Sequence, residues 1–198
     1  MRIAEEAAPF AAGWMVLGGA LALWSPTAAL VPLGLLAFTL YFFRDPERLP
    51  PVEPDVVVSP ADGRILQAGP ARISVFLNLT DVHICRAPVG GLVGSVAHVS
   101  GRFLAAFKDE ASEQNERTLI TVETERGPLA FTLVAGLIAR RIVCKVVPGQ
   151  SVATGERVGL IRFGSRVDVD LPAGARIEVR VGRRVVAGET VIARLVGD

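Results

Sequence analysis

The sequence predicts a mainly β fold, a compact sandwich or barrel, preceded by an N-terminal helical hairpin that associates with a membrane. Two long uncharged runs lie before residue 44. Valine is frequent beyond residue 52, and the chain has 20 glycines but only 6% aromatic residues. This composition is typical of short strands joined by turns. A stiff, proline-rich stretch separates the two regions. We therefore expect a hydrophobic hairpin at 1–44, a linker at 45–54 and a β-rich domain at 55–198.

The hairpin is predicted from the uncharged runs Phe10–Trp24 and Thr27–Phe43, with Ser25-Pro26 as the break between them. Each run gives a helix of roughly 23 to 26 Å at about 1.5 Å per residue. This is short of the ~20 residues that a typical hydrocarbon core requires. A tight hairpin that dips into the membrane or barely crosses it fits better than one long span. The aromatic residues before Arg44 are typical of an exit at the interface.

A signal peptide and a hairpin buried in a protein core are the two alternatives for this region. A signal peptide begins with a basic segment, but Glu5 and Glu6 offset Arg2, and no small-residue cleavage site is clear. A membrane hairpin returns the following domain to the side on which the chain begins. We expect the cell (inner) membrane, with the β-rich domain on its cytoplasmic side.

The β-rich domain is predicted as short strands between Gly, Pro and Asp turns. The clearest strand is Arg72–Leu79, where alternate residues are apolar. A hairpin is expected around the turn at 125–128, and the stretch 103–117 is expected to be loop with a helical turn. The other predicted strands are Val56–Val58, Arg64–Leu66, Leu119–Glu123 and Leu129–Val134.

An internal repeat indicates two related halves. Gly149–Val158 and Gly182–Val191 share the pattern G-x-x-V-x-x-G-E-x-V, 33 positions apart. Two copies are too few for a solenoid. The pattern is typical of a strand corner, a turn and a buried strand, and similar patterns occur in lipoyl- and biotinyl-type β-sandwiches. We therefore expect a sandwich or barrel built from two lipoyl/biotinyl-like halves.

Charge and cysteine content exclude several classes of function. The formal net charge is +1, so no basic field for nucleic acid is present. Cys85 and Cys144 form neither a CxxC pair nor a disulfide framework. Both are expected to be small buried apolar residues in a reducing compartment. No metal site is predicted.

Five segments carry the candidate chemistry, and they resemble one family in order and spacing. They are Phe42–Pro46, Ser59–Gly63, Asp81–Pro88, Glu110–Arg117 and Arg162–Val169. Together they resemble the short, archaeal-type phosphatidylserine decarboxylases over about residues 42–172. In that family the chain cuts itself at a Gly-Ser bond and the serine becomes a pyruvoyl group.

The resemblance implies self-cleavage between Gly164 and Ser165 into a β chain, 1–164, and an α chain, 165–198. Ser165 supplies the hydroxyl that attacks the carbonyl of Gly164, and a glycine leaves room for close attack and a strained backbone. The cofactor is then the pyruvoyl group made from Ser165, with no metal and no pyridoxal phosphate. Without the other segments, Gly164-Ser165 would be an ordinary turn.

Asp62 and His83 are the other catalytic candidates. Asp62 lies in the turn Pro60–Gly63, where it is either a structural turn residue or a carboxylate that orients a basic partner of Ser165. By resemblance it is the family's catalytic aspartate. Histidine exchanges protons near neutral pH. By resemblance, His83 is the residue that protonates the product.

The base for self-cleavage is unassigned. The bacterial and mitochondrial branch has a second histidine three residues after the first, and this chain has Arg86 there. Arginine stays protonated and is a poor base. His83 serving both steps and His98 as an auxiliary base remain open. Arg86 is either a surface ion-pair residue or a ligand for the substrate phosphate or carboxylate. Asn115 either contacts the substrate head group or caps a loop.

The expected function is decarboxylation of phosphatidylserine to phosphatidylethanolamine and CO₂ through a Schiff base on the pyruvoyl group. The expected partners are phosphatidylserine in the membrane and the two fragments of the chain itself, with a homo-oligomer left open and no nucleic acid. One alternative is a non-enzymatic, membrane-anchored lipoyl-like module, although neither Lys108 nor Lys145 lies in a carrier-type turn. Others are a relative that decarboxylates another serine-containing lipid and an inactive relative.

Overall fold

The computed structural model describes residues 2–108, 110–137, 141–162 and 165–195. The chain divides into two compact units, Met1–Glu47 and Arg48–Asp198. The first is helical and the second is built almost wholly of strands. The predicted mainly β fold with apolar helices at the N-terminus is therefore confirmed.

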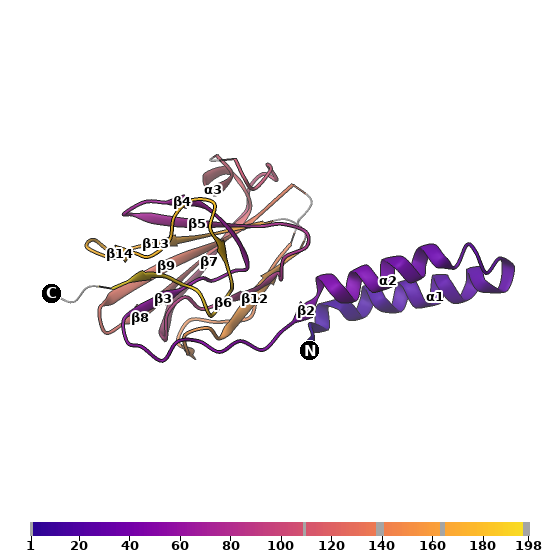
Figure 1. The fold of residues 1–198 in the computed structure, drawn as a ribbon, viewed down its shortest axis with the longest axis horizontal. Helices are drawn as coiled ribbons and strands as arrows, with labels where there is room; N and C mark the ends of the chain where they lie inside the picture. The colour runs from indigo at the N-terminus through magenta and orange to yellow at the C-terminus, as the bar shows by residue number, and fades with distance from the viewer. Residues whose placement is uncertain (1, 109, 138–140, 163–164, 196–198) are drawn as a thin grey trace. The chain divides into compact units, whose positions relative to one another are not determined.

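The helical unit is a hairpin of α1 (Ala8–Trp24) and α2 (Leu30–Phe42), which lie side by side in Figure 1. The indole N–H of Trp14 donates to Thr39 Oγ1 at 3.1 Å. The short strands β1 (Arg2–Ile3) and β2 (Arg44–Asp45) pair antiparallel and close the open end. A short 3₁₀ turn, Glu5–Ala7, leads into α1.

The first helical stretch is longer than its uncharged run predicts. Helical structure begins at Glu5, so the stretch Glu5–Trp24 has 20 residues with a mean hydropathy of 1.5. By length and composition, this is the one described helix that is long and apolar enough to cross a membrane; α2 is shorter. Large apolar side chains cover the outside of the hairpin, among them Leu23 and Trp24, which are 93% and 85% exposed.

The second unit contains one eight-stranded antiparallel sheet and two three-stranded sheets. The large sheet has the order β11-β7-β8-β9-β13-β5-β4-β15, and the smaller sheets are β10-β12-β6 and β14-β16-β3. Each sheet is open, so among the described strands no closed barrel forms. The strands are β3 (Val56–Val58), β4 (Gly63–Ala68), β5 (Arg72–Leu77), β6 (Ile84–Arg86), β7 (Gly91–Val99), β8 (Arg117–Thr124), β9 (Gly127–Ala135), β10 (Ile142–Cys144), β11 (Ser151–Val152), β12 (Arg157–Ile161), β13 (Ser165–Asp170), β14 (Arg176–Ile177), β15 (Arg184–Val185) and β16 (Val191–Arg194), and the short helix α3 is Ala111–Gln114.

The core lies under the centre of the large sheet. The alternate residues of β5 predicted to share a face, Ile73, Val75 and Leu77, are fully buried. They pair in register with Val169, Val167 and Ser165 of β13. Because alternate side chains of a strand share a face, Ser165 points to the same core side as these valines.

The two repeats make equivalent hydrogen bonds. The N–H of Gly155 donates to Ala87 O at 2.9 Å, and the N–H of Gly188 donates to Ser59 O at 2.8 Å. Both glycines have φ of +75°, a conformation that favours glycine. A Cβ on either would lie 3.4 Å from the Cα of the other, so the repeats meet at these two residues.

The segments that accept these hydrogen bonds form a second duplication, which was not predicted from the sequence. Residues 59–65 (SPADGRI) and 87–93 (APVGGLV) bind the two repeats in the same way, 28 positions apart. Gly63 and Gly91 share φ values of +153° and +156°. Asp62 in one half therefore corresponds to Gly90 in the other.

Candidate active site

Ser165 is the first residue of β13 and lies between β5 and β9, paired with Leu77 and Ala135. Its exposed fraction is 0%, and its hydroxyl oxygen has no hydrogen-bond partner among the described residues. Neither His83 nor Asp62 is therefore bonded to Ser165 Oγ in this structure. Gly164, the other half of the expected cleavage site, lies outside the described residues.

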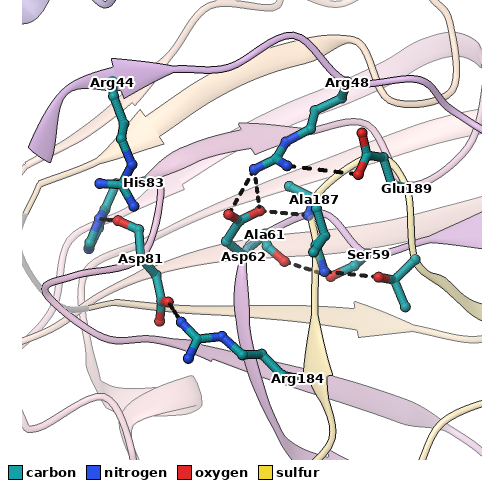
Figure 2. A network of polar contacts seen from close by, with 12 residues as sticks. Arg44, Arg48, Ser59, Ala61, Asp62, Asp81, His83, Arg184, Ala187 and Glu189 are labelled. Atoms are coloured by element: carbon teal, nitrogen blue, oxygen red, sulfur yellow. Dashed lines mark hydrogen bonds and ion pairs between the residues drawn. The ribbon is translucent and has the colours of Figure 1, made fainter. Parts of the chain in front are cut away.

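Asp62 lies in the turn between β3 and β4. In each of its described hydrogen bonds, the carboxylate accepts from an N–H group. The guanidinium of Arg48 donates to both carboxylate oxygens, at 3.2 and 2.9 Å. The N–H of Ala187 donates to Oδ1 at 2.7 Å, and Arg48 also pairs with Glu189 at 3.8 Å (Figure 2). The Asp62 carboxylate is thus fixed by one residue before it in the chain and one from the second repeat.

His83 lies in the segment between β5 and β6, and its exposed fraction is 2%. Its ring Nδ1 is 2.9 Å from the carbonyl oxygen of Asp81 (Figure 2). The backbone carbonyl of His83 accepts the N–H of Ile161, at 3.3 Å, at the end of β12. Since Ile161 is four residues before Ser165, this bond ties His83 to the segment that leads to the candidate cleavage site.

Arg86 ends β6 and is buried, with an exposed fraction of 4%. Its Nη1 donates to Gly155 O at 2.8 Å, and its backbone N–H donates to Pro60 O at 2.8 Å, in the turn that carries Asp62. A Cβ on Gly188 would lie 3.0 Å from Arg86 Cδ. The absence of a side chain at Gly188, in the second repeat, therefore leaves room for this arginine.

Asn115 is fully buried and caps a loop. Its Oδ1 accepts the Leu104 N–H at 2.8 Å, and its Nδ2 donates to Leu104 O at 2.8 Å and to Ala135 O at 2.7 Å. These are the contacts of the loop-capping alternative that the sequence left open. Because Ala135 pairs with Ser165, the cap also links the backbone of Leu104 to the strand beside the candidate site.

His98 is not brought to Ser165. It lies on β7, three strands from β13, in register through Thr118 and Leu133 with Val167. At about 4.8 Å per strand this places their Cα atoms roughly 14 Å apart. The His98 side chain is 52% exposed, and its described contacts are Thr118 Oγ1 at 3.2 Å and Glu116 Oε1 at 4.0 Å.

The comparison with protein-family models identifies the family of this chain. The phosphatidylserine decarboxylase model matches residues 35–72 and 69–193, which include every candidate residue above. The chain belongs to the phosphatidylserine decarboxylase family. It is therefore placed among carboxy-lyases that act on phosphatidylserine, as the motifs predicted.

The structure adds a buried ion pair that follows the candidate cleavage residue in this family member. Arg166 and Asp168 are 2% and 1% exposed, and Arg166 Nε donates to Asp168 Oδ1 at 2.6 Å. Arg166 also donates to Ser74 Oγ at 2.8 Å, and Ser112 Oγ donates to Asp168 Oδ2 at 2.6 Å. This network lies on the face opposite Ser165 and fixes the α3 segment to the centre of the sheet.

Five residues of these networks have no role predicted from the sequence, although three of them lie in the motif segments. They are Arg48, Asp81, Arg166, Asp168 and Arg184. A signal was present only for Arg166 and Asp168, whose opposite charges alternate along a strand and so share a face. The pairs Arg48–Asp62 and Arg184–Asp81 join distant parts of the chain, and nothing local indicates them.

Neither cysteine has the character of a nucleophile. Burial raises the pKa of Cys85 far above its ordinary value, and burial also raises the pKa of Cys144. Both thiols are free. Among the described residues, no cluster of three or more His, Cys, Asp or Glu side chains is arranged to hold a metal ion.

Proposed function

We propose that this chain cleaves itself between Gly164 and Ser165 and uses a pyruvoyl group at residue 165 to convert phosphatidylserine to phosphatidylethanolamine. The observation that carries the proposal is the buried Ser165 hydroxyl without a described hydrogen-bond partner. Buried hydroxyls are nearly always bonded, and one left unsatisfied costs about 1–3 kcal/mol. A buried, unbonded hydroxyl at the start of a central strand lowers stability, so a catalytic role explains the serine better than a structural role does.

The proposed cleavage balances without a metal. Ser165 Oγ attacks the Gly164 carbonyl and forms an ester as the peptide C–N bond breaks and the nitrogen takes a proton. Removal of the Ser165 Cα proton then breaks the ester Cβ–O bond, which releases the 1–164 chain with a carboxylate. Hydrolysis of the remaining dehydroalanine releases ammonia and leaves pyruvoyl on the 165–198 chain.

Asp62 is proposed as the carboxylate that orients the base of self-cleavage. Support comes from its rigid environment, because Arg48 and the Ala187 N–H fix both carboxylate oxygens. The base itself stays open between His83 and a residue not yet identified. For His98 to serve, it would have to act across the three-strand separation from β13.

For decarboxylation, a pyruvoyl carbonyl supplies an electrophile for the substrate amine and an electron sink as CO₂ leaves. His83 is proposed to return a proton to the α-carbon of the substrate. Its burial keeps bulk water away from the ring, and its backbone bond to Ile161 holds it beside the end of β12, four residues before Ser165 in the chain. Proton transfer by such a residue is typically worth about 10²–10⁴ in rate.

Of the two candidate substrate-binding residues, Arg86 and Asn115, we propose that Arg86 binds the phosphate or carboxylate of the lipid. Its planar guanidinium fork matches the geometry of a phosphate or carboxylate, and its backbone N–H bonds the turn that carries Asp62. For Asn115 a substrate contact would compete with its bonds to Leu104 and Ala135.

The apolar hairpin is proposed to hold the enzyme at the membrane in which its substrate lies. The β1–β2 pairing brings the end of the hairpin beside its own start. This supports the proposal that the catalytic unit lies on the side of the inner membrane where the chain begins, proposed to be the cytoplasmic side. The proposed partners are the two chains of the cleaved protein, with a homo-oligomer left open. Membership of the short, archaeal-type branch is likewise a proposal.

The test is release of CO₂ from phosphatidylserine in vesicles, measured beside labelling of the protein with a carbonyl-reactive probe. Wild-type protein should release CO₂ and carry the label on the 165–198 chain. Ser165→Ala should do neither, because no oxygen remains to form the ester. Ser151→Ala, at the exposed first residue of β11, is the matched control and should behave as wild type. Turnover by Ser165→Ala would overturn the proposal.

A further inference from the structure

Asp81 organises the turn that precedes His83. Its Oδ2 accepts the Asn78 N–H at 2.8 Å, and its own N–H donates to Asn78 O at 2.9 Å. Its other oxygen, Oδ1, accepts Arg184 Nη2 at 2.5 Å (Figure 2). The Asp81 side chain is only 6% exposed, whereas that of Arg184 is 64% exposed. A nearly buried carboxylate is therefore neutralised from the surface by one arginine.

The backbone carbonyl of the same aspartate determines which ring nitrogen of His83 carries hydrogen. Asp81 O lies 2.9 Å from His83 Nδ1, and a carbonyl oxygen only accepts. Nδ1 must therefore carry the hydrogen of the neutral ring. The lone pair is then on Nε2, because the bond made by one nitrogen sets the state of the other. In the proposed role of His83, Nε2 is then the atom that takes up and delivers a proton.

We propose that Asp81 and Arg184 are positioning residues for His83, which set its ring orientation and its Nδ1–H tautomer so that Nε2 faces the reaction. This inference rests on the proposed role of His83 as the proton donor. The contacts form one chain, from the Arg184 guanidinium through the Asp81 carboxylate and turn to the Asp81 carbonyl and the imidazole. Each link is a described hydrogen bond of 2.9 Å or less.

The ion pair has a further consequence if the chain is cleaved after Gly164. Arg184 then belongs to the 165–198 chain, while Asp81 and His83 belong to the 1–164 chain. The smaller chain would supply both the electrophile and the arginine that orders the proton donor. Correct seating of the smaller chain would therefore be a condition for proton transfer.

The test uses full-length, processed protein with ¹⁵N-labelled histidine in detergent. Only two histidines are present, so the ring signals of His83 are assigned by comparison with His98→Gln. Wild-type His83 should show the Nδ1–H tautomer. Arg184→Met should shift the ring toward Nε2–H and lower kcat about 3- to 10-fold with KM unchanged, the effect expected for loss of one exposed ion pair acting on the chemical step. Asp81→Ala should do so more strongly.

Two controls separate positioning from stability. Arg184→Lys keeps the charge and should restore most of the tautomer and kcat. Arg180→Met removes an exposed arginine of the preceding loop and should change neither. The inference is overturned if wild-type His83 is Nε2–H, or if Arg184→Met leaves tautomer and kcat unchanged. Failure of the proposed function is distinguishable, because the wild-type ring would then show Nδ1–H while no CO₂ is released.

Discussion

Ser165→Ala should make the uncut chain more stable as well as inactive. In the structure, Ser165 Oγ is buried and has no described hydrogen-bond partner. An unsatisfied buried hydroxyl costs about 1–3 kcal/mol, which alanine does not incur. The void left by a single oxygen offsets only a fraction of this gain. We therefore expect a net stabilisation of about 1–2 kcal/mol, or roughly 2–8 °C in Tm at about 2–4 °C per kcal/mol for a unit of this size.

The comparison needs an uncut reference that keeps the hydroxyl. Asp62→Ala is expected to leave most of the chain uncut, so Asp62→Ala and the double variant Asp62→Ala/Ser165→Ala form the matched pair. Thermal unfolding of both in the same detergent, with the cut fraction measured on a gel, gives the difference. A double variant that is less stable than Asp62→Ala would refute the reasoning, because it would show that the hydroxyl makes a stabilising bond.

The remaining variants test separate parts of the structure. His83→Ala should lower decarboxylation about 10²–10⁴-fold per pyruvoyl group while the chain is still cut. Asp62→Ala should instead leave mostly uncut chain. If the His83→Ala chain is wholly uncut, His83 is itself the cleavage base. Asp168→Ala should lower the free energy of unfolding by about 3–5 kcal/mol, because it leaves the buried Arg166 guanidinium unpaired. Replacing both residues together by apolar ones of similar size should recover much of that loss in urea titrations, and no recovery would contradict the ion-pair explanation. Deleting residues 1–43 should leave a folded β unit that no longer sediments with membranes, and unchanged sedimentation would show that the β unit itself binds them.

Local patterns predicted the strands and the hairpin region well. Alternation of Ile73, Val75 and Leu77 identified β5 and its buried face, and the turn at 125–128 identified the β8–β9 hairpin. The repeat at Gly149 and Gly182 predicted related halves, whose hydrogen bonds are equivalent in the structure. These features depend on residues close together in the chain, so they can be predicted from one sequence.

Features that depend on distant contacts were not predictable. The second duplication was missed because residues 59–65 and 87–93 share little beyond a proline and a glycine at equivalent positions. The Arg48–Asp62 and Arg184–Asp81 pairs depend on how strands far apart in the chain come together. Helical structure also begins before the uncharged run, because charged Glu5 and Glu6 form the 3₁₀ turn that leads into α1.

The most direct test of the account is the intact mass of the purified wild-type protein. The account predicts two chains, 1–164 ending in a free carboxylate and 165–198 beginning with a pyruvoyl group. A single uncut chain that nevertheless releases CO₂ from phosphatidylserine would contradict it.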